Sequence, residues 1–395
     1  MGIEKRVELL SRLEKARGRP LITYITSSRP NASANIAADV VHELMSQLDA
    51  LPKGSEELDL LLVSNGGDPT VAWRIVSLIR ERVHKFAVLV PQAAYSAATL
   101  IALGADEIVM HPHGNLGPTD PQIRSARSSN GSERTPFGSE DLAAFLKFAK
   151  EVGLTDQTQL LSVFNHFCEE VGSVAVGVAA RSSQLGVTMG EKLLQLHMKA
   201  DGDRSKARAI SEKLTRDFFH HGYPLSRMEA KAIGLPIGDH DAEVEDLLWR
   251  IWLDYSDELQ LRSMANDFEF LVGNPDFAPL LSGIPHGLVQ VNSASALAVM
   301  PQSGSNGIVI PPVRFERIYA YMESPRLATR HVMHGSILAG RQPDLNIKLA
   351  KVVDFTGWIT IDLPQSASAV DSSSGHPGKS SRPTARPPKP KEPTK

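Results

Sequence analysis

A serine, Ser96, stands where an apolar strand-like run gives way to an apolar helical stretch, in the segment Tyr95-Ser96-Ala97-Ala98-Thr99. A serine at such a place lies in the positive field of the helix N-terminus, and the N–H of Ala97 is free to donate to a developing negative oxygen. The same place also suits a serine that only caps the helix, which is the commoner role for serine there. Position alone therefore leaves both roles open and favours the cap.

A glycine pair lies in the segment Ser64-Asn65-Gly66-Gly67-Asp68-Pro69, directly after an apolar run. Two glycines at the carboxyl end of a strand let backbone N–H groups face outward, and in open α/β sheets ligands bind at that end. Such a turn could hold an oxyanion, although a plain tight turn would have the same sequence. The chain has no G-x-G-x-x-G pattern, so a dinucleotide site is not indicated.

Candidate acids and bases follow later in the chain. His111 and His113 flank Pro112, Asp120 lies within a Gly-Pro-Thr-Asp-Pro-Gln segment, and His220 and His221 are adjacent. A serine nucleophile needs a neutral imidazole to accept its proton, and that imidazole needs a carboxylate to fix its tautomer. The histidines lack the spacing of zinc motifs, so no metal site is expected.

The elements that must position these residues form an alternating pattern between Leu21 and about Ile123. Short apolar runs interleaved with helical periods predict a parallel sheet covered on both faces. The expected strands are Leu21–Ile25, Leu58–Val63, Phe86–Val90 and Glu107–Met110. Three helices are expected. The first carries Ile36, Val40, Leu44 and Leu48 on one face, the second carries Val71, Ile75, Leu78 and Ile79 on its buried face, and the third spans Ser96 to Leu103.

The remainder of the chain divides by composition. Leu142–Leu214 is predicted to be mostly helical with breaks at Gly153, Gly172 and Gly186. Ser226 and Glu229 form a capping-box pattern that opens a short helix. Valine- and isoleucine-rich pieces from about Leu288 to Asp362 indicate an added β-containing region.

Composition excludes several classes of protein. The 395 residues include 42 basic and 45 acidic ones, a formal net charge of −3, so bulk attraction to nucleic acid or to an anionic membrane is not expected. The single cysteine, Cys168, and the charged N-terminus favour a reducing, cytoplasmic location. The segment Phe86–Ala105 has no charged residue, but Pro91 and Gln92 interrupt it, which favours a strand and a buried helix over a membrane span.

Four ordered blocks carry a resemblance that spans roughly Leu21 to Ile237. They are Leu60–Gly67, Val88–Pro91 with Ser96–Met110, Leu116–Gln122, and His221–Pro224 running into Glu229–Pro236. At these residues the sequence resembles the Clp-fold serine proteases, and most closely the family called serine dehydrogenase proteinase. The resemblance implies a Clp/crotonase-like α/β fold with a core of parallel strands covered by helices.

The family is described with a Ser, Asp, His triad in that chain order. Carried over, the resemblance implies that Ser96 is the nucleophile, Asp120 the carboxylate and His221 the base. It implies the N–H groups of Gly67 and Ala97 as the oxyanion donors.

Gly66 and Tyr95 are expected to support the predicted site. Signal peptide peptidases, which are distant relatives, use a lysine as the base. Lys147 and Lys150 follow Ser96 at a suitable distance and are the alternative base, ranked after His221.

The expected domains are a serine hydrolase domain at 1–240, a helical and β-containing extension at 241–364, and a disordered, basic, Pro/Ser-rich tail at 365–395. The resemblance implies a serine protease without a cofactor that acts on a peptide or protein substrate as a homo-oligomer. An unfoldase or another regulatory partner is left open. The alternatives are a crotonase-like acyl-CoA enzyme that uses the same oxyanion donors and a non-catalytic oligomeric scaffold of the same fold.

Overall fold

The computed structural model describes residues 2–122, 139–218, 220–281, 287–291, 300 and 308–363. The described chain up to Leu363 forms one compact unit built on a nine-stranded mixed sheet. The predicted basic tail at 365–395 and the Ser/Arg-rich stretch from Arg124 to Pro136 lie outside the described residues.

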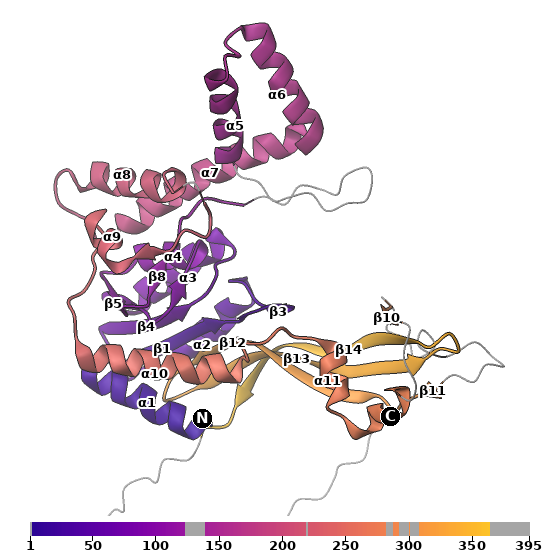
Figure 1. The fold of residues 1–395 in the computed structure, drawn as a ribbon. Helices are drawn as coiled ribbons and strands as arrows, with labels where there is room; N and C mark the ends of the chain where they lie inside the picture. Colours follow the sequence, from indigo (N-terminus) through magenta and orange to yellow (C-terminus); the bar gives the residue numbers. More distant parts are fainter. Residues whose placement is uncertain are drawn as a thin grey trace, which may run out of the picture. The chain divides into compact units, whose positions relative to one another are not determined.

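Four neighbouring strands form the parallel half of the sheet. They are β1 (Leu21–Thr26), β4 (Glu57–Val63), β5 (Lys85–Val90) and β7 (Glu107–Met110), and they lie side by side in chain order. Because parallel strands are joined by right-handed crossovers, the connecting helices gather on one face (Figure 1). These helices are α2 (Val40–Asp49), α3 (Pro69–Arg82) and α4 (Ala97–Leu103). The predicted α/β class is confirmed.

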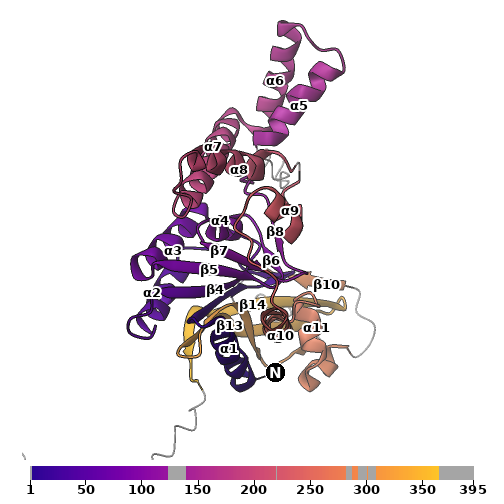
Figure 2. The same ribbon diagram turned by 90° about the vertical axis from the view of Figure 1, so that its left-hand side faces the viewer.

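Both faces of this half-sheet are buried. Since side chains alternate along a strand, Leu60 and Leu62 of β4 pack with α2, α3 and α4, while Leu61 and Val63 pack on the opposite face. That opposite face is covered by α1 (Ile3–Arg17) and α10 (Ala242–Glu258), which lie together in both views (Figures 1 and 2). A strand buried on both faces reads as a continuous apolar run, which is the pattern that the sequence displays.

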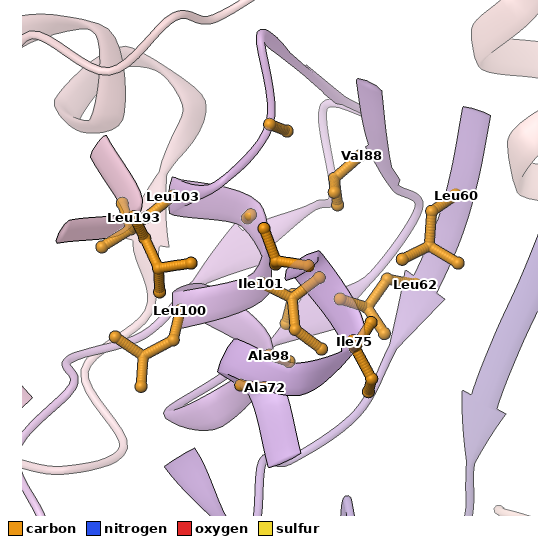
Figure 3. Packing of buried hydrophobic residues seen from close by; sticks show 14 of the residues in the cluster. Leu60, Leu62, Ala72, Ile75, Val88, Ala98, Leu100, Ile101, Leu103 and Leu193 are labelled. Carbon is orange, nitrogen blue, oxygen red and sulfur yellow. The ribbon is translucent and has the colours of Figure 1, made fainter. Parts of the chain in front are cut away.

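The helix that begins at Ser96 is buried along its whole length. Ala98 and Ile101 of α4 lie against α3 and the strands, and Leu100 and Leu103 lie toward Leu193 of α7 (Ser173–Leu194) (Figure 3). The charge-free segment that includes α4 is thus core, as predicted. Within the residues that the structure describes, none of the helices combines the length and hydropathy needed to span a bilayer.

The C-terminal strands extend the same sheet. β12 (Val313–Glu323), β13 (Ala328–Arg341) and β14 (Asn346–Ile361) form an antiparallel meander, and β12 pairs antiparallel with β1. Two further pieces, β10 (Gly287–Gln290) and β11 (Ile308–Val309), pair with β14 and β13. The predicted β-containing extension is confirmed, but the sheet runs without a break across the boundary predicted at residue 240.

A second core supports the extension. The short helix α11 (Asp267–Val272) and the 3₁₀ helix η1 (Pro275–Leu281) lie on one face of the meander, where Leu271 and Phe277 pack against Phe315 and Ile337. A small hairpin, β2 (Ser28–Arg29) with β3 (Ala32–Ser33), follows β1.

A buried ion-pair network joins β12 to the two helices that cover one face of the sheet, α1 and α10. The guanidinium of Arg6 on α1 lies 2.7 Å from Glu323 on β12 and 2.6 Å from Asp254 on α10. Tyr255 donates from its hydroxyl to Glu323 at 2.7 Å and also lies under the guanidinium. Because each buried charge has an opposite partner, the network tolerates burial that would otherwise be costly.

The helices depart from the sequence expectation at two points, one in α7 and one at the start of α2. The segment 139–232 contains α5 (Ser139–Glu151), α6 (Gln157–Val171), α7, α8 (Asp203–Arg216) and α9 (Arg227–Ala232). Gly153 and Gly172 separate helices as predicted, but Gly186 lies inside α7, where its lack of a side chain allows close packing beside Thr119. Ile36 is not part of α2, which begins at Val40.

Candidate active site

The candidate residues emerge from one end of a small three-stranded sheet. Its strands are β6 (Ala93–Ala94), β8 (Asn115–Leu116) and β9 (Leu225–Ser226), with β6 parallel to β8 and β8 antiparallel to β9. Ser96 follows β6 and Asp120 follows β8, while His221 precedes β9. Since β9 runs in the opposite direction, all three residues leave the sheet at the same end.

Ser96 has a strained backbone. Its φ of 52° and ψ of −117° lie in a region that glycine favours and other residues rarely adopt. Its side chain makes no capping hydrogen bond to α4, although Ser96 occupies the N-cap position. The prediction, made from position alone, that the Ser96 side chain caps the helix is therefore wrong. Backbone strain of this kind persists only where the surrounding structure holds the residue in place.

The loop after β4, which contains Gly66 and Gly67, lies in close contact with Ser96. A Cβ atom on Gly66 would lie 2.6 Å from Cβ of Ser96, 2.7 Å from the carbonyl oxygen of Tyr95 and 3.1 Å from N of Ala97. Gly66 itself has a φ of 104°. Only glycine fits this approach, so the predicted supporting role of Gly66 has a steric basis in this structure.

Gly67 is held by a segment that sequence reasoning assigned to a helix. Ile36 forms a parallel bridge with Gly67, in which the N–H of Ile36 donates to the carbonyl of Gly66 at 2.8 Å and its own carbonyl accepts from Asp68 at 2.9 Å. The apolar period that included Ile36 in a helix misled because a buried extended residue and a buried helical one carry the same apolar side chain. Ile36 thus positions the loop.

Two backbone donors remain unused at this loop. Ala97 is the first residue of α4, so its N–H has no partner inside the helix, and the bridge to Ile36 does not use the N–H of Gly67. Neither N–H donates a hydrogen bond to any other described residue. These are the two groups that the sequence predicted as oxyanion donors.

Asp120 and His221 form a pair. Nδ1 of His221 lies 2.8 Å from Oδ1 of Asp120, and the amide of Gln122 donates to Oδ2 of the same carboxylate at 2.7 Å. The hydrogen bond and charge of Asp120 raise the pKa of His221 above its ordinary value, against the opposing effect of burial. Both side chains are partly buried, with 34% and 16% of the His221 and Asp120 side chains exposed.

The structure separates His221 from the other candidate histidines. The neighbouring His220 is exposed, and its Nδ1 accepts from the N–H of Gly222 at 3.0 Å. His111 stacks on Trp249 of α10 with ring centroids 5.0 Å apart, and His113 meets the same indole edge-on. Of the histidines that the sequence offered as candidate bases, His221 is the one that contacts a carboxylate. No hydrogen bond joins it to Ser96 in the described part of the chain, a looseness that apo triads can show.

Thr99 is a positioning residue that sequence reasoning missed. Its hydroxyl, which is fully buried, lies 2.7 Å from the carbonyl oxygen of Ala94 and 2.9 Å from that of Gly117, and it accepts from the N–H of Gly117 at 3.1 Å. These contacts tie α4 to the ends of β6 and β8. A buried threonine three residues after a candidate serine was the available signal, because a buried hydroxyl must find partners.

Tyr95 fills the space beside this junction. Its N–H donates to the carbonyl of Ser64 at 2.9 Å, and a Cβ on Gly117 would lie 2.6 Å from its ring. Burial raises the pKa of the Tyr95 phenol, so it stays protonated at neutral pH.

The alternative bases lie on the surface of α5. Lys147 and Lys150 are exposed, and the ammonium of Lys147 lies 3.8 Å from Glu151 one turn on. Both views place α5 beyond α7 from α4 (Figures 1 and 2). Among the described residues there is also no group of three or more His, Cys, Asp or Glu side chains that could hold a metal ion.

Comparison with known families supports the resemblance over the first third of the chain. Residues 2–130 match the family described as ClpP-like SDH-type serine proteinase. The match includes Ser96, Gly67 and Asp120 and ends before His221. The predicted resemblance is confirmed for that segment, and it supports a serine proteinase of the ClpP-like kind.

Two relatives match a longer part of the chain. Two uncharacterized proteins of Methanocaldococcus jannaschii are 26% identical over 243 residues and 24% identical over 266 residues. The matches cover 60% and 65% of this chain and 72% and 80% of those proteins.

The solved structures that resemble the chain are more distant. A variant of the 1510-N membrane-bound stomatin-specific protease is 14% identical, with a TM-score of 0.34 and coverage of 57% of this chain and 82% of that one. ClpP1 from Listeria monocytogenes is 12% identical, with a TM-score of 0.30 and coverage of 60% and 99%.

Proposed function

We propose that this protein is a serine peptidase in which Ser96 attacks a peptide carbonyl with His221 as the base. The observation that carries the proposal is the hydrogen bond between His221 and Asp120, which forms at the same end of the three-stranded sheet as Ser96. The family match over residues 2–130 supports the same reaction class.

The carboxylate of Asp120 selects the tautomer of the base. With Nδ1–H of His221 donating to Asp120 at 2.8 Å, Nε2 carries the lone pair and accepts the proton of the Ser96 hydroxyl. Serine oxygen then bonds to the carbonyl carbon, and the electron pair of the C=O bond moves onto oxygen. The imidazolium that results is stabilised by Asp120. When the intermediate collapses, the C=O bond re-forms, the C–N bond breaks and the imidazolium gives its proton to the leaving amine.

The oxyanion of the tetrahedral intermediate accepts from the N–H groups of Gly67 and Ala97. Neither group has another partner among the described residues, so neither must break a bond to serve. A Cβ atom on Gly66 would lie 2.6 Å from Cβ of Ser96 and 3.1 Å from N of Ala97, so the loop that carries Gly67 lies next to the serine and to the second donor. Loss of one such donor costs about 10²- to 10³-fold in turnover. Water then takes the place of the amine. His221 accepts a proton from it as its oxygen bonds to the acyl carbon, and collapse of the second intermediate breaks the ester bond and returns the proton to the oxygen of Ser96.

A fluorophosphonate probe tests the proposal, because it labels only a serine that a base activates. We expect labelling of the full chain, no labelling of Ser96→Ala and strong loss in His221→Ala. His220→Ala is the matched control, since His220 is the adjacent residue and has no carboxylate partner among the residues that the structure describes. Failure of the folded protein to react, or equal losses in the two histidine variants, would overturn the assignment.

The same variants separate the competing readings. If Lys147→Ala or Lys150→Ala removes labelling while His221→Ala retains it, the base is a lysine. A CoA-dependent reaction that Ser96→Ala leaves intact would indicate a crotonase-like acyl-CoA enzyme, and absence of any reaction would indicate a scaffold.

We also propose that the peptidase acts as a homo-oligomer. Large apolar side chains remain exposed on α5, α6 and α7, including Phe148 at 60%, Leu161 at 58% and Val174 at 79%. Light scattering tests this directly, and a monomer at micromolar concentration would refute it. Peptide substrates and an unfoldase or regulatory partner belong to the same proposal.

A further inference from the structure

A cavity of about 230 Å³ lies beside β1, at a place that the proposed reaction does not use. Four aromatic rings and one carboxylate stand in its wall, from Tyr24, Tyr319, His331, Trp358 and Asp39. The cavity is smaller than the pockets of roughly 300–1,000 Å³ that accept drug-sized ligands. Its size suits a single side chain or a small head group.

Two pairs of these rings meet at nearly right angles. Tyr319 and His331 meet edge-on at an interplanar angle of 87° with centroids 6.1 Å apart, and His331 and Trp358 meet at 82° with centroids 5.5 Å apart. Perpendicular rings form the sides of a box. Since the faces of aromatic rings carry negative potential, such a box attracts a cation.

The sheet is modified to build this wall. Ala320, His331 and Trp358 are register partners across β12, β13 and β14, so they form one row on one face. A bulge between Ile318 and Ala320 leaves Tyr319 without a partner on β13. Consecutive side chains in a regular strand point to opposite faces, yet Tyr319 and Ala320 both line the cavity. The bulge therefore turns the phenol ring into the box.

The carboxylate of Asp39 completes the site. The indole N–H of Trp358 donates to its Oδ2 at 2.8 Å, and Nε2 of His331 lies 3.7 Å from the same oxygen. Oδ1 has no hydrogen-bond partner among the described residues, and the side chain does not cap α2. It is the one carboxylate in the lining, and no described lysine or arginine accompanies it.

Burial also keeps the imidazole in the wall uncharged. Desolvation lowers the pKa of His331 below its ordinary value, against the smaller opposing effect of Asp39. At neutral pH the imidazole of His331 therefore adds no positive charge to the box.

We propose that this cavity binds an organic cation, an alkylated ammonium or a guanidinium group, between the rings of Tyr319 and Trp358 and the carboxylate of Asp39. The cation can belong to a free small molecule or to a lysine or arginine side chain of a bound peptide. The peptide source rests on the proposed peptidase function, and it has a structural basis. Ala34, Asn35 and Ala37 in the cavity wall flank Ile36, which holds Gly67.

Titration calorimetry on the full chain carrying Ser96→Ala tests binding without cleavage. The probe is tetramethylammonium, and tert-butanol is the neutral comparator of similar shape. We expect saturable binding of tetramethylammonium that is at least about tenfold tighter than that of tert-butanol. Equal affinity for the two would overturn the proposal.

Variants locate the binding. Asp39→Asn and Tyr319→Leu should each weaken tetramethylammonium by about tenfold. Asp49→Asn, at the other end of α2, is the matched control and should leave affinity unchanged. Retained affinity in both cavity variants would overturn the assignment. Because Asp39 is exposed and does not cap the helix, its variant is expected to fold.

Peptides distinguish the two sources. A blocked peptide with lysine is compared with the same peptide carrying norleucine, on the same Ser96→Ala protein. If the lysine peptide binds more tightly than the norleucine peptide, and Asp39→Asn removes the difference, the cavity binds a substrate side chain. If only tetramethylammonium binds, the cavity binds a free cation. If neither cation binds, the proposal fails. None of these results depends on whether Ser96 is a nucleophile, so the two proposals can fail separately.

Discussion

Nδ1 of His221 lies 2.8 Å from Oδ1 of Asp120, although 101 positions of sequence separate the two residues. The contact depends on β8 and β9, which pair antiparallel. The segment after β8, with Asp120, and the segment before β9, with His221, therefore lie at the same end of the small sheet. Gln122 occupies the second oxygen of the carboxylate, so the pair has a fixed orientation.

Replacing Asp120 should change both the rate and its pH dependence. The base must be neutral, and Asp120 raises the pKa of His221, so activity should fall as pH drops through a value above the ordinary 6.5. In Asp120→Asn we expect turnover to fall by about 10³- to 10⁴-fold and the acid limb of the residual activity to move to lower pH. A peptidase assay across pH measures both, and an unmoved acid limb would contradict the role.

The same pKa shift predicts a pH-dependent stability. A histidine whose pKa is raised in the folded state contributes stability that is fully present below the unfolded pKa, near 6.5, and lost as pH rises through the folded value. Asp120→Asn should therefore lower the melting temperature more at about pH 5.5 than at about pH 8.5. A loss that is equal at the two pH values would be inconsistent with this coupling.

The strained backbone of Ser96 predicts that replacing this residue with glycine removes activity but gains stability relative to alanine. Ser96→Gly should be more stable than Ser96→Ala by about 1 kcal/mol, because a φ of 52° with a ψ of −117° favours glycine, and both variants should be inactive. Ser77, inside α3, is the matched control, where glycine should be less stable than alanine by about 1 kcal/mol. Urea unfolding of the four variants gives the comparison. The same order at both positions would refute strain at Ser96.

Adding one methyl group at Gly66 should damage the site directly. Its Cβ would meet Ser96 and the backbone of Tyr95 at 2.6 and 2.7 Å, so Gly66→Ala should cost about 2–4 kcal/mol and remove activity. Gly54 also has a positive φ, of 80°, but nothing within 4 Å of a built Cβ. Gly54→Ala should cost about 1 kcal/mol and keep full activity. Similar outcomes in the two variants would argue against the close approach.

Removal of the buried hydroxyl of Thr99 should loosen the junction between α4, β6 and β8. Thr99→Val leaves the N–H and carbonyl of Gly117 without this partner, which should cost about 1–3 kcal/mol and lower turnover. Thr158→Val, at an exposed position of α6, should change stability by less than about 0.5 kcal/mol. Chemical denaturation and probe-labelling rates check the two effects, and an intact labelling rate in Thr99→Val would limit its role to stability.

The main strands and helices of the parallel half of the sheet were predictable because each is a buried element with a local apolar pattern. The strands that lead to Ser64 and to Tyr95 are apolar on both faces, α3 repeats apolar residues at helical spacing, and α4 is a continuous uncharged run. The capping-box pattern of Ser226 and Glu229 likewise predicted the start of α9. The local sequence pattern was sufficient to predict an element wherever its residues lie in the same buried layer of the structure.

Contacts between distant segments could not be read in this way. Ile36 resembles a helical core residue until Gly67 is seen to pair with it. The distinction between His220 and His221 came from a family resemblance, since two adjacent histidines have the same local sequence. The cavity was invisible because Asp39 and Trp358 lie 319 positions apart and meet only through the meander.

The ion pair between Arg6 and Glu323 spans 317 positions of the chain. During synthesis, α1 must therefore wait for α10 and β12 before the charge of its arginine is neutralised, long after every residue proposed for the reaction has been made. Contacts of such high sequence separation slow folding, because the intervening chain must first be ordered. The stability that this ion pair contributes is therefore absent from the growing chain until β12 has been made and has joined the sheet.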